Sequence, residues 1–370
     1  MVDFAIRSFD LGGTETTDGL DIFGTAGDDV IVGTAGDDRI IAGFGVDTVS
    51  AGAGNDTITG GSNYDEGAAP VPGATGLGDM GEVIVLPDQP IEMLDGGNGA
   101  DTAVLSGDQS SYTLLMRPGG MVLINRRTGG DGVDNLDNIE FLDFADELNM
   151  FGGAPMNLDL FGRQGAVGAD DLESIIELYV AYFNRAPDAL GLSFWADAFS
   201  KGTTLEEMAS LFMQQDETLA AYPPTLTTSE LVDTVYENTL GREPDAEGKA
   251  FWIAQLDAGL VSQDQLILEL IAGAQAEPYD GASQGFMDLQ EADRYNLATK
   301  TDIGTYFAVH RGMSNTDNAA AVMDLYDGTQ TSIAAAKNAV DDFFAAALDP
   351  SDGEFLMPLT GVLDNPFDWG

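Results

Sequence analysis

Residues 24–59 repeat a nine-residue pattern, and this repeat constrains the possible folds of the chain more than any other feature. Four consecutive units begin at Gly24, Gly33, Ala42 and Ala51. Each unit has glycine at its fourth place, Asp at its sixth and an aliphatic residue at its eighth. The aspartates are Asp29, Asp38, Asp47 and Asp56, and the aliphatic residues are Ile31, Ile40, Val49 and Ile58. A flexible Gly/Asp-rich linker would not keep these places in phase, so the pattern indicates a repeat architecture.

The order of residues within each unit predicts a turn followed by a short strand. Glycine reaches positive φ and allows neighbouring backbones to approach closely, so the first six residues favour a turn. The last three residues form a minimal strand whose one apolar side chain points to one face. A single unit cannot bury that side chain. Stacked units can, in a narrow spiral with parallel strands inside and turns outside.

Stacking also brings the Asp carboxylates and the turn carbonyls into register. Cages made only of oxygen suit a hard cation that takes many ligands, such as Ca²⁺. Without the ion these carboxylates repel one another, so folding and metal binding are expected to occur together. We therefore expect residues 24–61 to be disordered without calcium, while the C-terminal half keeps its structure.

The nonapeptide resembles the RTX calcium-binding repeat, G-G-x-G-x-D-x-U-x, in which U is aliphatic. The resemblance implies a parallel β-roll, several bound calcium ions, and export of the unfolded chain by a type I secretion apparatus. The protein would then fold outside the cell, where calcium is plentiful. All four units depart from the pattern at one place, with Thr25 and Thr34 at the second place of the first two units and Ala42 and Ala51 at the first place of the last two. These departures bear on the affinity of the sites. The candidate calcium-site residues are Gly24, Gly27, Asp29, Gly33, Gly36, Asp38, Gly43, Gly45, Asp47, Gly52, Gly54, Asp56, Gly97, Gly99 and Asp101.

Composition narrows the classes of partner. The 370 residues include 63 acidic and 14 basic ones, a formal net charge of −49. This charge argues against nucleic acid or an anionic membrane as partner and favours cations, although a saline habitat also selects acidic surfaces. Cysteine is absent, which excludes disulfides and Cys-ligated metals. The first twenty residues do not form a signal peptide, and no run of about 18 apolar residues predicts a membrane span.

A further nonapeptide, at 96–104, stands apart from the first four. The Gly/Pro-rich stretch 62–82 precedes it, so we expect this stretch to loop out of the spiral before the chain adds another rung. The unit contains Gly97, Gly99 and Asp101. Because Asp101 belongs to an isolated unit, we expect it to contribute less to calcium-dependent folding than Asp47.

Residues 112–146 predict a β-rich segment that closes the spiral. Tyr112–Asn125 is predicted to be a hairpin about Pro118–Gly120, and Ile139–Phe144 a strand. The stretch DGVDNLDNIEFLDFAD (131–146) resembles the segment that closes many RTX arrays. Its loop with Asp131, Asp134 and Asp137 is a candidate for one more cation, but a solvated turn is the simpler interpretation.

The composition changes near residues 152–168, where helix-period apolar residues replace the Gly/Asp turns. Asp170 and Glu173 have the spacing of a capping box that opens a helix at 172–184. An internal duplication follows, because FNRAPDALGLSFW (183–195) aligns with LGREPDAEGKAFW (240–252) at an offset of 57 residues. The offset is 58 further on, where the box at Thr204 and Glu207 aligns with that at Ser262 and Gln265.

The duplicated R-x-P-D-x-x-G-x-x-F-W motif resembles the DUF4214 domain, and it is also similar to phycobilisome linker repeats. Residues 297–329 resemble the helical tail beyond such repeats. The expected architecture is therefore multidomain: an N-terminal parallel β-roll with a β-rich closing segment at 1–151, then an all-α DUF4214-like domain at 152–345. Residues 346–370 would be an open, acidic tail with the position of a type I secretion signal.

Within the motif, Pro187 and Pro244 end one helix, and Asp188 and Asp245 are expected to cap the next. The pairs Phe194–Trp195 and Phe251–Trp252 are expected to anchor the core between helices, with sugar binding by the two Trp as the alternative. Arg185 and Arg242 are expected to pair with nearby carboxylates.

No catalytic motif is evident. His310 is the only histidine, and it follows a helical run, which favours a helix C-terminal position over a catalytic role. Neither G-x-S-x-G nor H-E-x-x-H occurs. We expect a secreted calcium-binding protein with a structural or adhesive role, in contact with itself or a cell-surface polysaccharide. A glycan- or protein-binding module and an extracellular hydrolase with an unidentified carboxylate site are the alternatives.

Overall fold

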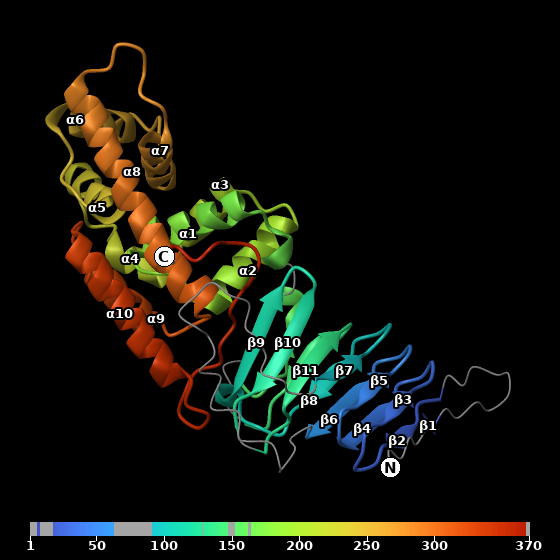
Figure 1. The fold of residues 1–370 in the computed structure, drawn as a ribbon. Coiled ribbons are helices and arrows are strands. Elements are labelled where there is room, and N and C mark those ends of the chain that lie inside the picture. The colour runs from blue at the N-terminus through green and yellow to red at the C-terminus, as the bar shows by residue number, and fades with distance from the viewer. Residues whose placement is uncertain are drawn as a thin grey trace. The chain divides into compact units, whose positions relative to one another are not determined.

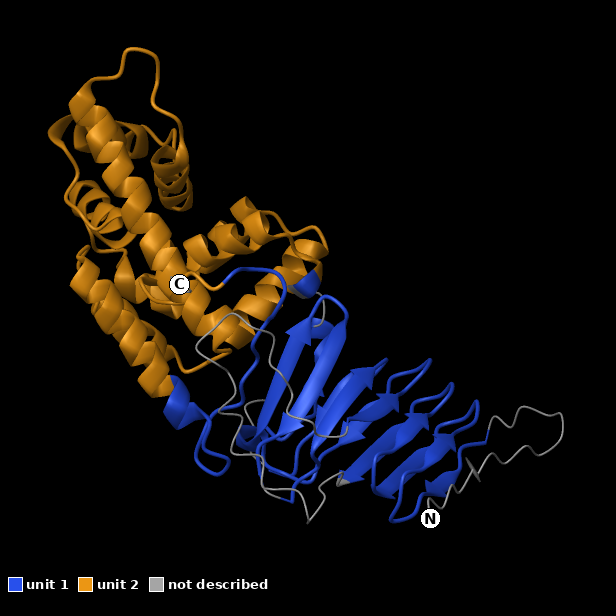
Figure 2. Ribbon diagram, viewed as in Figure 1, with its two compact units in different colours: residues 1–165, 344–364 blue, residues 166–343, 365–370 orange. Residues whose placement is uncertain are grey.

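The computed structural model describes residues 6–7, 18–62, 91–127, 129–146, 152–161 and 164–367. The chain divides into two compact units, shown in Figure 2. Unit 1 comprises residues 1–165 and 344–364, and unit 2 comprises residues 166–343 and 365–370. The division differs from the expected one, because its first boundary falls at 165 and a C-terminal segment belongs with the N-terminal unit.

Unit 1 is a parallel β-roll made of two sheets (Figure 1). Alternate nonapeptides enter alternate sheets, so one turn of the roll takes two units. The seven-stranded sheet runs β1 (Ile6–Arg7), β3 (Val30–Val32), β5 (Thr48–Ser50), β7 (Glu92–Asp95), β11 (Val133–Asp137), β10 (Gly120–Asn125) and β9 (Tyr112–Arg117). The six-stranded sheet runs β13 (Met156–Asn157), β12 (Phe141–Asp143), β8 (Thr102–Val104), β6 (Thr57–Ser62), β4 (Arg39–Phe44) and β2 (Asp21–Phe23).

The aliphatic residues at the eighth place form the core of the roll. In one sheet Ile31 pairs with Val49 and Val49 with Leu94, and in the other Ile40 pairs with Ile58. All five side chains are buried. Each such burial stabilises the stack by roughly 1.5–3 kcal/mol. The expected spiral of parallel strands is therefore confirmed.

The roll continues beyond the first four units. Strand β7 pairs with β5 and β8 with β6, so the nonapeptide at 96–104 adds a rung, as expected. The closing segment adds another, because β11 pairs with β7 and β12 with β8. Except for Ser62, the expected insertion loop at 62–82 lies outside the described residues.

The roll ends in the predicted hairpin of β9 and β10, and the C-terminal segment adds to it. Bridges join Thr113 to Leu356 and Met116 to Leu359, and the amide of Leu114 donates to the carbonyl of Leu356 at 2.8 Å. Phe355, Leu356, Met357 and Leu359 are buried. The expectation of an open tail at 346–370 is wrong for this stretch, because its apolar residues cover the free edge of β9.

Arg126 fastens this C-terminal segment to the hairpin. Its guanidinium donates to the carbonyl of Tyr112 at 2.8 Å and to the carbonyl of Glu354 at 2.6 Å. It also donates to the hydroxyl of Thr113 at 2.7 Å. Burial lowers the pKa of Arg126 to about 10.

Unit 2 is helical (Figure 1). The first repeat contains α1 (Ala169–Phe183), α2 (Ala189–Ser200), α3 (Leu205–Phe212) and α4 (Asp216–Ala221), and the second contains α5 (Thr228–Leu240), α6 (Ala246–Asp257) and α7 (Gln263–Gln275). After them come α8 (Gln284–Thr305), a π-helical turn (Tyr306–His310), α9 (Thr316–Asp324) and α10 (Gln330–Ala347). Helix α1 packs against α2, α3, α4, α5, α7 and α8, and its residues Leu172–Tyr182 supply much of the core.

Most of the predicted helix starts are confirmed. Asp188 and Asp245 cap α2 and α6, and the boxes at Thr204 and Ser262 open α3 and α7. The box predicted at Asp170 is wrong. Helix α1 begins at Ala169 behind Gly168, with no side-chain cap, so Asp170 lies inside its first turn.

The duplicated aromatic pairs are more exposed than expected. Phe194 is 42% exposed and Phe251 is 53% exposed, so these two residues do not anchor the core, while Trp195 and Trp252 are half-buried.

The expected ion pairs are confirmed, between Arg185 and Glu217 and between Arg242 and Asp293. No helix among the described residues is long and apolar enough to cross a membrane.

Replacing Arg126 with alanine should loosen the attachment of the C-terminal segment to the hairpin. Arg126→Ala removes several charge-assisted hydrogen bonds, so we expect a loss of about 3 kcal/mol in the free energy of unfolding of the roll. Urea denaturation with hydrogen exchange of residues 112–125, in the presence of calcium, measures this. Arg117→Ala is the control at an exposed position of the same hairpin. An equal effect of both substitutions would contradict the role given to Arg126.

Candidate calcium sites

The Asp at the sixth place of each unit lies where a turn becomes a strand, and its side chain is buried. The exposed fractions are 3% for Asp29, 2% for Asp38, 0% for Asp47, 1% for Asp56 and 0% for Asp101. Buried carboxylates need hydrogen bonds or cations, because burial without a partner costs several kcal/mol.

One carboxylate oxygen of Asp38, Asp47, Asp56 and Asp101 has a partner in the preceding turn of the roll, which for Asp38 is the amide of Leu20 at 2.7 Å. The amide of Asp29 donates to Oδ1 of Asp47 at 2.9 Å, and the amide of Asp38 donates to Oδ1 of Asp56 at 2.6 Å. The amide of Asp56 donates to Oδ1 of Asp101 at 2.6 Å. The carboxylates therefore join successive rungs along both sides of the roll.

The second oxygen separates the sites into two kinds. In the first two units a Thr at the second place supplies its amide to Oδ2 of the Asp, at 2.5 Å in Asp29 and 2.6 Å in Asp38. The Thr hydroxyl, which Gly lacks, also donates to the carboxylate, at 2.8 Å from Thr25 to Asp29 and 3.0 Å from Thr34 to Asp38. Units with Gly at that place supply no donor, and Oδ2 of Asp47, Asp56 and Asp101 is buried without a partner. The departures from the repeat pattern thus decide which carboxylates are left open to a cation.

Most glycines of the units are needed for one of two reasons, a positive φ or the close approach of another backbone. Gly43 has φ +110°, a conformation that other residues rarely adopt. At Gly24 a Cβ would lie 2.0 Å from the carbonyl oxygen of Ala42 on the next rung. Positive φ also occurs at Gly45, Gly52, Gly54 and Gly97, and close approach at Gly33 and Gly99. A Cβ at Gly27 would meet nothing within 4 Å, so space does not require glycine there.

These residues fit calcium. Each open oxygen belongs to a carboxylate and lies beside closely stacked turns, and Ca²⁺ prefers carboxylate and carbonyl oxygens. Within the described ranges, no three acidic or histidine side chains meet as a metal centre. Asp47, Asp56 and Asp101 would therefore each give one carboxylate, with main-chain carbonyls of the turns as the remaining protein ligands. A bound ion would neutralise these carboxylates and tie the turns together.

Two acidic residues of the same series, Glu92 and Glu140, were not predicted from the sequence, and a third, Asp134, was named only within the candidate cation loop at 131–137. By strand pairing, Glu92 is the neighbour of Asp134, and β5 pairs with β7 so that Glu92 follows Asp47. On the other side the amide of Asp101 donates to Glu140 at 2.8 Å. All three share a weaker signal, an acidic residue two places before a buried aliphatic one: Glu92 before Leu94, Asp134 before Leu136 and Glu140 before Leu142.

Glu92 and Asp134 are a buried acidic pair, with exposed fractions of 0% and 2%. Burial, followed by the charge of Asp134, raises the pKa of Glu92, and burial raises the pKa of Asp134. Neither oxygen of Glu92 accepts a hydrogen bond from a protein donor.

Because Asp134 is buried, the interpretation of Asp131, Asp134 and Asp137 as one solvated turn is wrong. Only Asp137 is exposed, and Asp131 accepts from the amide of Ser106 at 3.0 Å.

The reason given for ranking Asp47 above Asp101 is also wrong. Asp101 is not isolated in space, since β8 lies between β6 and β12 just as β5 lies between β3 and β7. Each of the two carboxylates accepts a hydrogen bond from an amide of the preceding turn at Oδ1, and in each Oδ2 has no protein partner. The structure thus gives no basis for ranking these two aspartates.

Two family models match the chain. Residues 23–58 match the RTX calcium-binding nonapeptide repeat in four copies, and residues 209–276 match a domain of unknown function, DUF4214. The second match covers the end of the first helical repeat and all of the second. A search of curated proteins found no match. The RTX repeats imply a secreted, calcium-binding protein.

Asparagine substitutions should separate open from satisfied carboxylates. Asp47→Asn and Asp101→Asn keep Oδ1 but remove a charged ligand, so we expect each to raise the calcium concentration needed for folding by about tenfold. Asp38→Asn disturbs a carboxylate already satisfied by Thr34, and should raise the calcium concentration needed for folding by less than the other two substitutions do. Circular dichroism during calcium titration measures this. A larger calcium shift for Asp38→Asn than for the other two would contradict the division.

Without calcium, the roll should become more stable as the pH falls. Burial raises the pKa of Asp56 to about 6 from its ordinary 3.8. The folded roll therefore holds a proton that the unfolded chain has lost, and this stability is gained between about pH 6 and 3.8. Circular dichroism of calcium-depleted protein at pH 7 and pH 5 tests it, with more β-structure expected at pH 5 and a smaller difference expected for Asp56→Asn. Equal β-structure content at both pH values would contradict the account.

Proposed function

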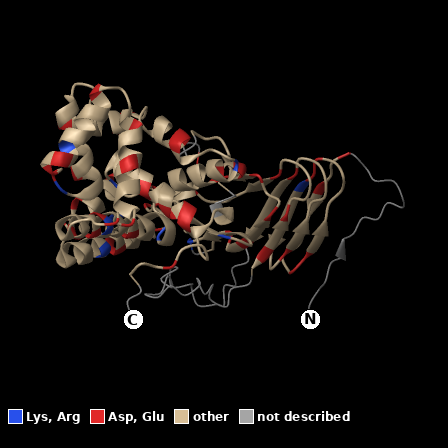
Figure 3. Cartoon of the chain, turned by 90° about the horizontal axis from the view of Figure 1, so that it is seen from above, with Lys and Arg blue, Asp and Glu red and all other residues tan. Residues whose placement is uncertain are grey.

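We propose that this secreted calcium-binding protein has a structural or adhesive role at a cell surface, in a matrix or in a surface layer. The acidic excess is the observation that carries the proposal. Even if every Lys and Arg paired with a different carboxylate, 49 of the 63 acidic residues would have no basic partner. Figure 3 shows acidic residues along the turns of the roll and over the helices, with basic residues at few places.

This charge makes association between copies depend on divalent cations. Copies with a net charge of −49 repel one another, and monovalent salt only screens that repulsion. A divalent ion can instead bridge carboxylates of two molecules, since Ca²⁺ takes six to eight oxygen ligands. The calcium that folds the roll would thus also allow the folded protein to assemble.

The role that we propose is not catalytic. His310 lies in the π-helical turn at the end of α8, with its ring centroid 6.5 Å from that of Tyr306. This is the expected helix C-terminal position, and a single imidazole there explains no reaction.

The type I route of export also remains a prediction. Expression beside a type I transporter, with medium and cell pellet assayed separately, tests it.

Calcium should convert the purified full-length protein from monomers into regular assemblies. Electron microscopy and light scattering with calcium, with magnesium at equal ionic strength, and after chelation measure this. We expect assemblies only with calcium, because Mg²⁺ keeps its waters and tolerates fewer ligand geometries. Monomers under all three conditions would contradict a lattice role. Assemblies that form in magnesium without calcium would show that screening of the negative charge is sufficient for association.

A further inference from the structure

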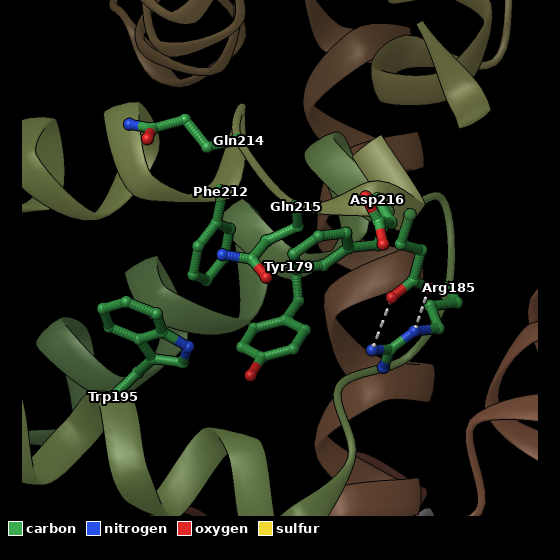
Figure 4. A pocket seen from close by; sticks show the side chains of 9 residues that line it. Tyr179, Arg185, Trp195, Phe212, Gln214, Gln215 and Asp216 are labelled. Carbon is green, nitrogen blue, oxygen red and sulfur yellow. Dashed lines mark hydrogen bonds and ion pairs between the residues drawn. The ribbon is translucent and has the colours of Figure 1, made fainter. Parts of the chain in front are cut away.

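A cavity of about 540 Å³ opens in the first helical repeat of unit 2. This volume lies within the range of small-molecule sites, about 300–1,000 Å³. The aromatic part of its lining is Tyr179, Phe183, Trp195 and Phe212, and the polar part includes Gln215 and Asp216. Figure 4 shows the amide of Gln215 among the rings of Phe212, Tyr179 and Trp195.

Phe212 is the centre of the aromatic wall. Its ring centroid lies 5.1 Å from that of Tyr179, 5.1 Å from that of Trp195 and 4.8 Å from that of Phe183. Phe212 is fully buried, whereas Trp195 and Phe183 are half-buried. The cavity therefore has a rigid apolar wall with aromatic surface left open to a ligand.

Two polar groups in this wall take part in no hydrogen bond among the residues that the structure describes. They are the hydroxyl of Tyr179, a residue that is only 3% exposed, and Nε1 of Trp195. The second repeat differs at the equivalent place, because Nε1 of Trp252 donates to the hydroxyl of Tyr236 at 3.1 Å. In the first repeat both groups remain available to a ligand.

The second repeat lacks this lining. An offset of 58 residues places Phe212 at the position of Leu270. Helix α7 then continues unbroken to Gln275, whereas α3 ends at Phe212 and α4 begins at Asp216. Gln214 and Gln215 therefore belong to a break between helices that α7 does not have.

Charge in the cavity restricts the ligand. The guanidinium of Arg185 is bound to Glu217 at 2.5 Å and lies 5.5 Å from the ring of Tyr179 and 5.3 Å from that of Phe183. These rings therefore already have a cation beside them, which disfavours a second one. Glu217 and Asp216 repel an anion, and Arg185 is neutralised by its partners. A neutral ligand fits best.

We propose that this cavity binds a neutral saccharide. The C–H face of a sugar ring is apolar and can lie against Trp195, while its hydroxyl groups donate to Asp216 or the amide oxygen of Gln215. They can also accept from Nε1 of Trp195 and the hydroxyl of Tyr179, whose unmet hydrogen bonds would favour a hydroxylated ligand over an apolar one. This deepens the adhesive role proposed above, and rests on it, by giving the ligand class.

The test is calorimetric titration of the full-length protein, with calcium, against soluble dextran, mannan and xyloglucan. Trp195→Ala should weaken binding by about tenfold or more, the loss of one aromatic contact. The double variant Gln215→Ala and Asp216→Ala should also weaken binding by about tenfold. Both residues are exposed and Gln215 does not cap α4 with its side chain, so this variant should fold normally. Trp252→Ala is the matched control in the second repeat and should bind as the unaltered protein does.

Each outcome decides the proposal. Binding of a neutral polysaccharide that both cavity variants weaken and Trp252→Ala preserves supports it, with circular dichroism showing that the variants are folded. Binding of none of the three, preference for the anionic hyaluronate or for polylysine, or binding unaffected by the cavity variants overturns it. Light scattering of the same samples separates the two proposals, because calcium-dependent assembly without saccharide binding overturns only this one.

Discussion

The hydrogen bond from a main-chain amide to the Asp carboxylate of the next turn is the interaction on which the roll depends. It joins Asp29 to Asp47, Asp38 to Asp56 and Asp56 to Asp101. Each bond requires a buried carboxylate, and in three of the five units the second oxygen has no protein partner. A cation at these oxygens would stabilise the roll, and its removal would leave buried, like-charged groups close together. We therefore expect the stability of the fold to depend on the calcium concentration around it.

The helical unit is stabilised in a different way. It buries a continuous apolar core around α1, and its scarce basic residues pair with carboxylates, as Arg242 does with Asp293. We therefore expect its stability to need no ion. One chain would then combine a unit that folds with calcium and a unit that folds by apolar burial, which suits a protein that acts only after export.

The sequence predicts the features whose causes are local. The turns follow from glycine and Asp at fixed places, and the capping boxes at Thr204 and Ser262 need only residues three positions apart. The pairing of the C-terminal segment could not be predicted, because Leu356 pairs with Thr113 from the far end of the chain. Glu92 was missed, and Asp134 was assigned to a solvated turn, because their turns lack the glycine pattern. The capping box at Asp170 was predicted wrongly because α1 starts earlier than its apolar period indicates.

Hydrogen exchange of the full-length protein with and without calcium tests the central claim most directly. The account predicts that amides of residues 21–62 and 92–143 are protected only with calcium, while amides in α1, α5 and α8 are protected equally in both conditions. Equal protection of the roll without calcium would contradict it, because the open carboxylates would then not need an ion.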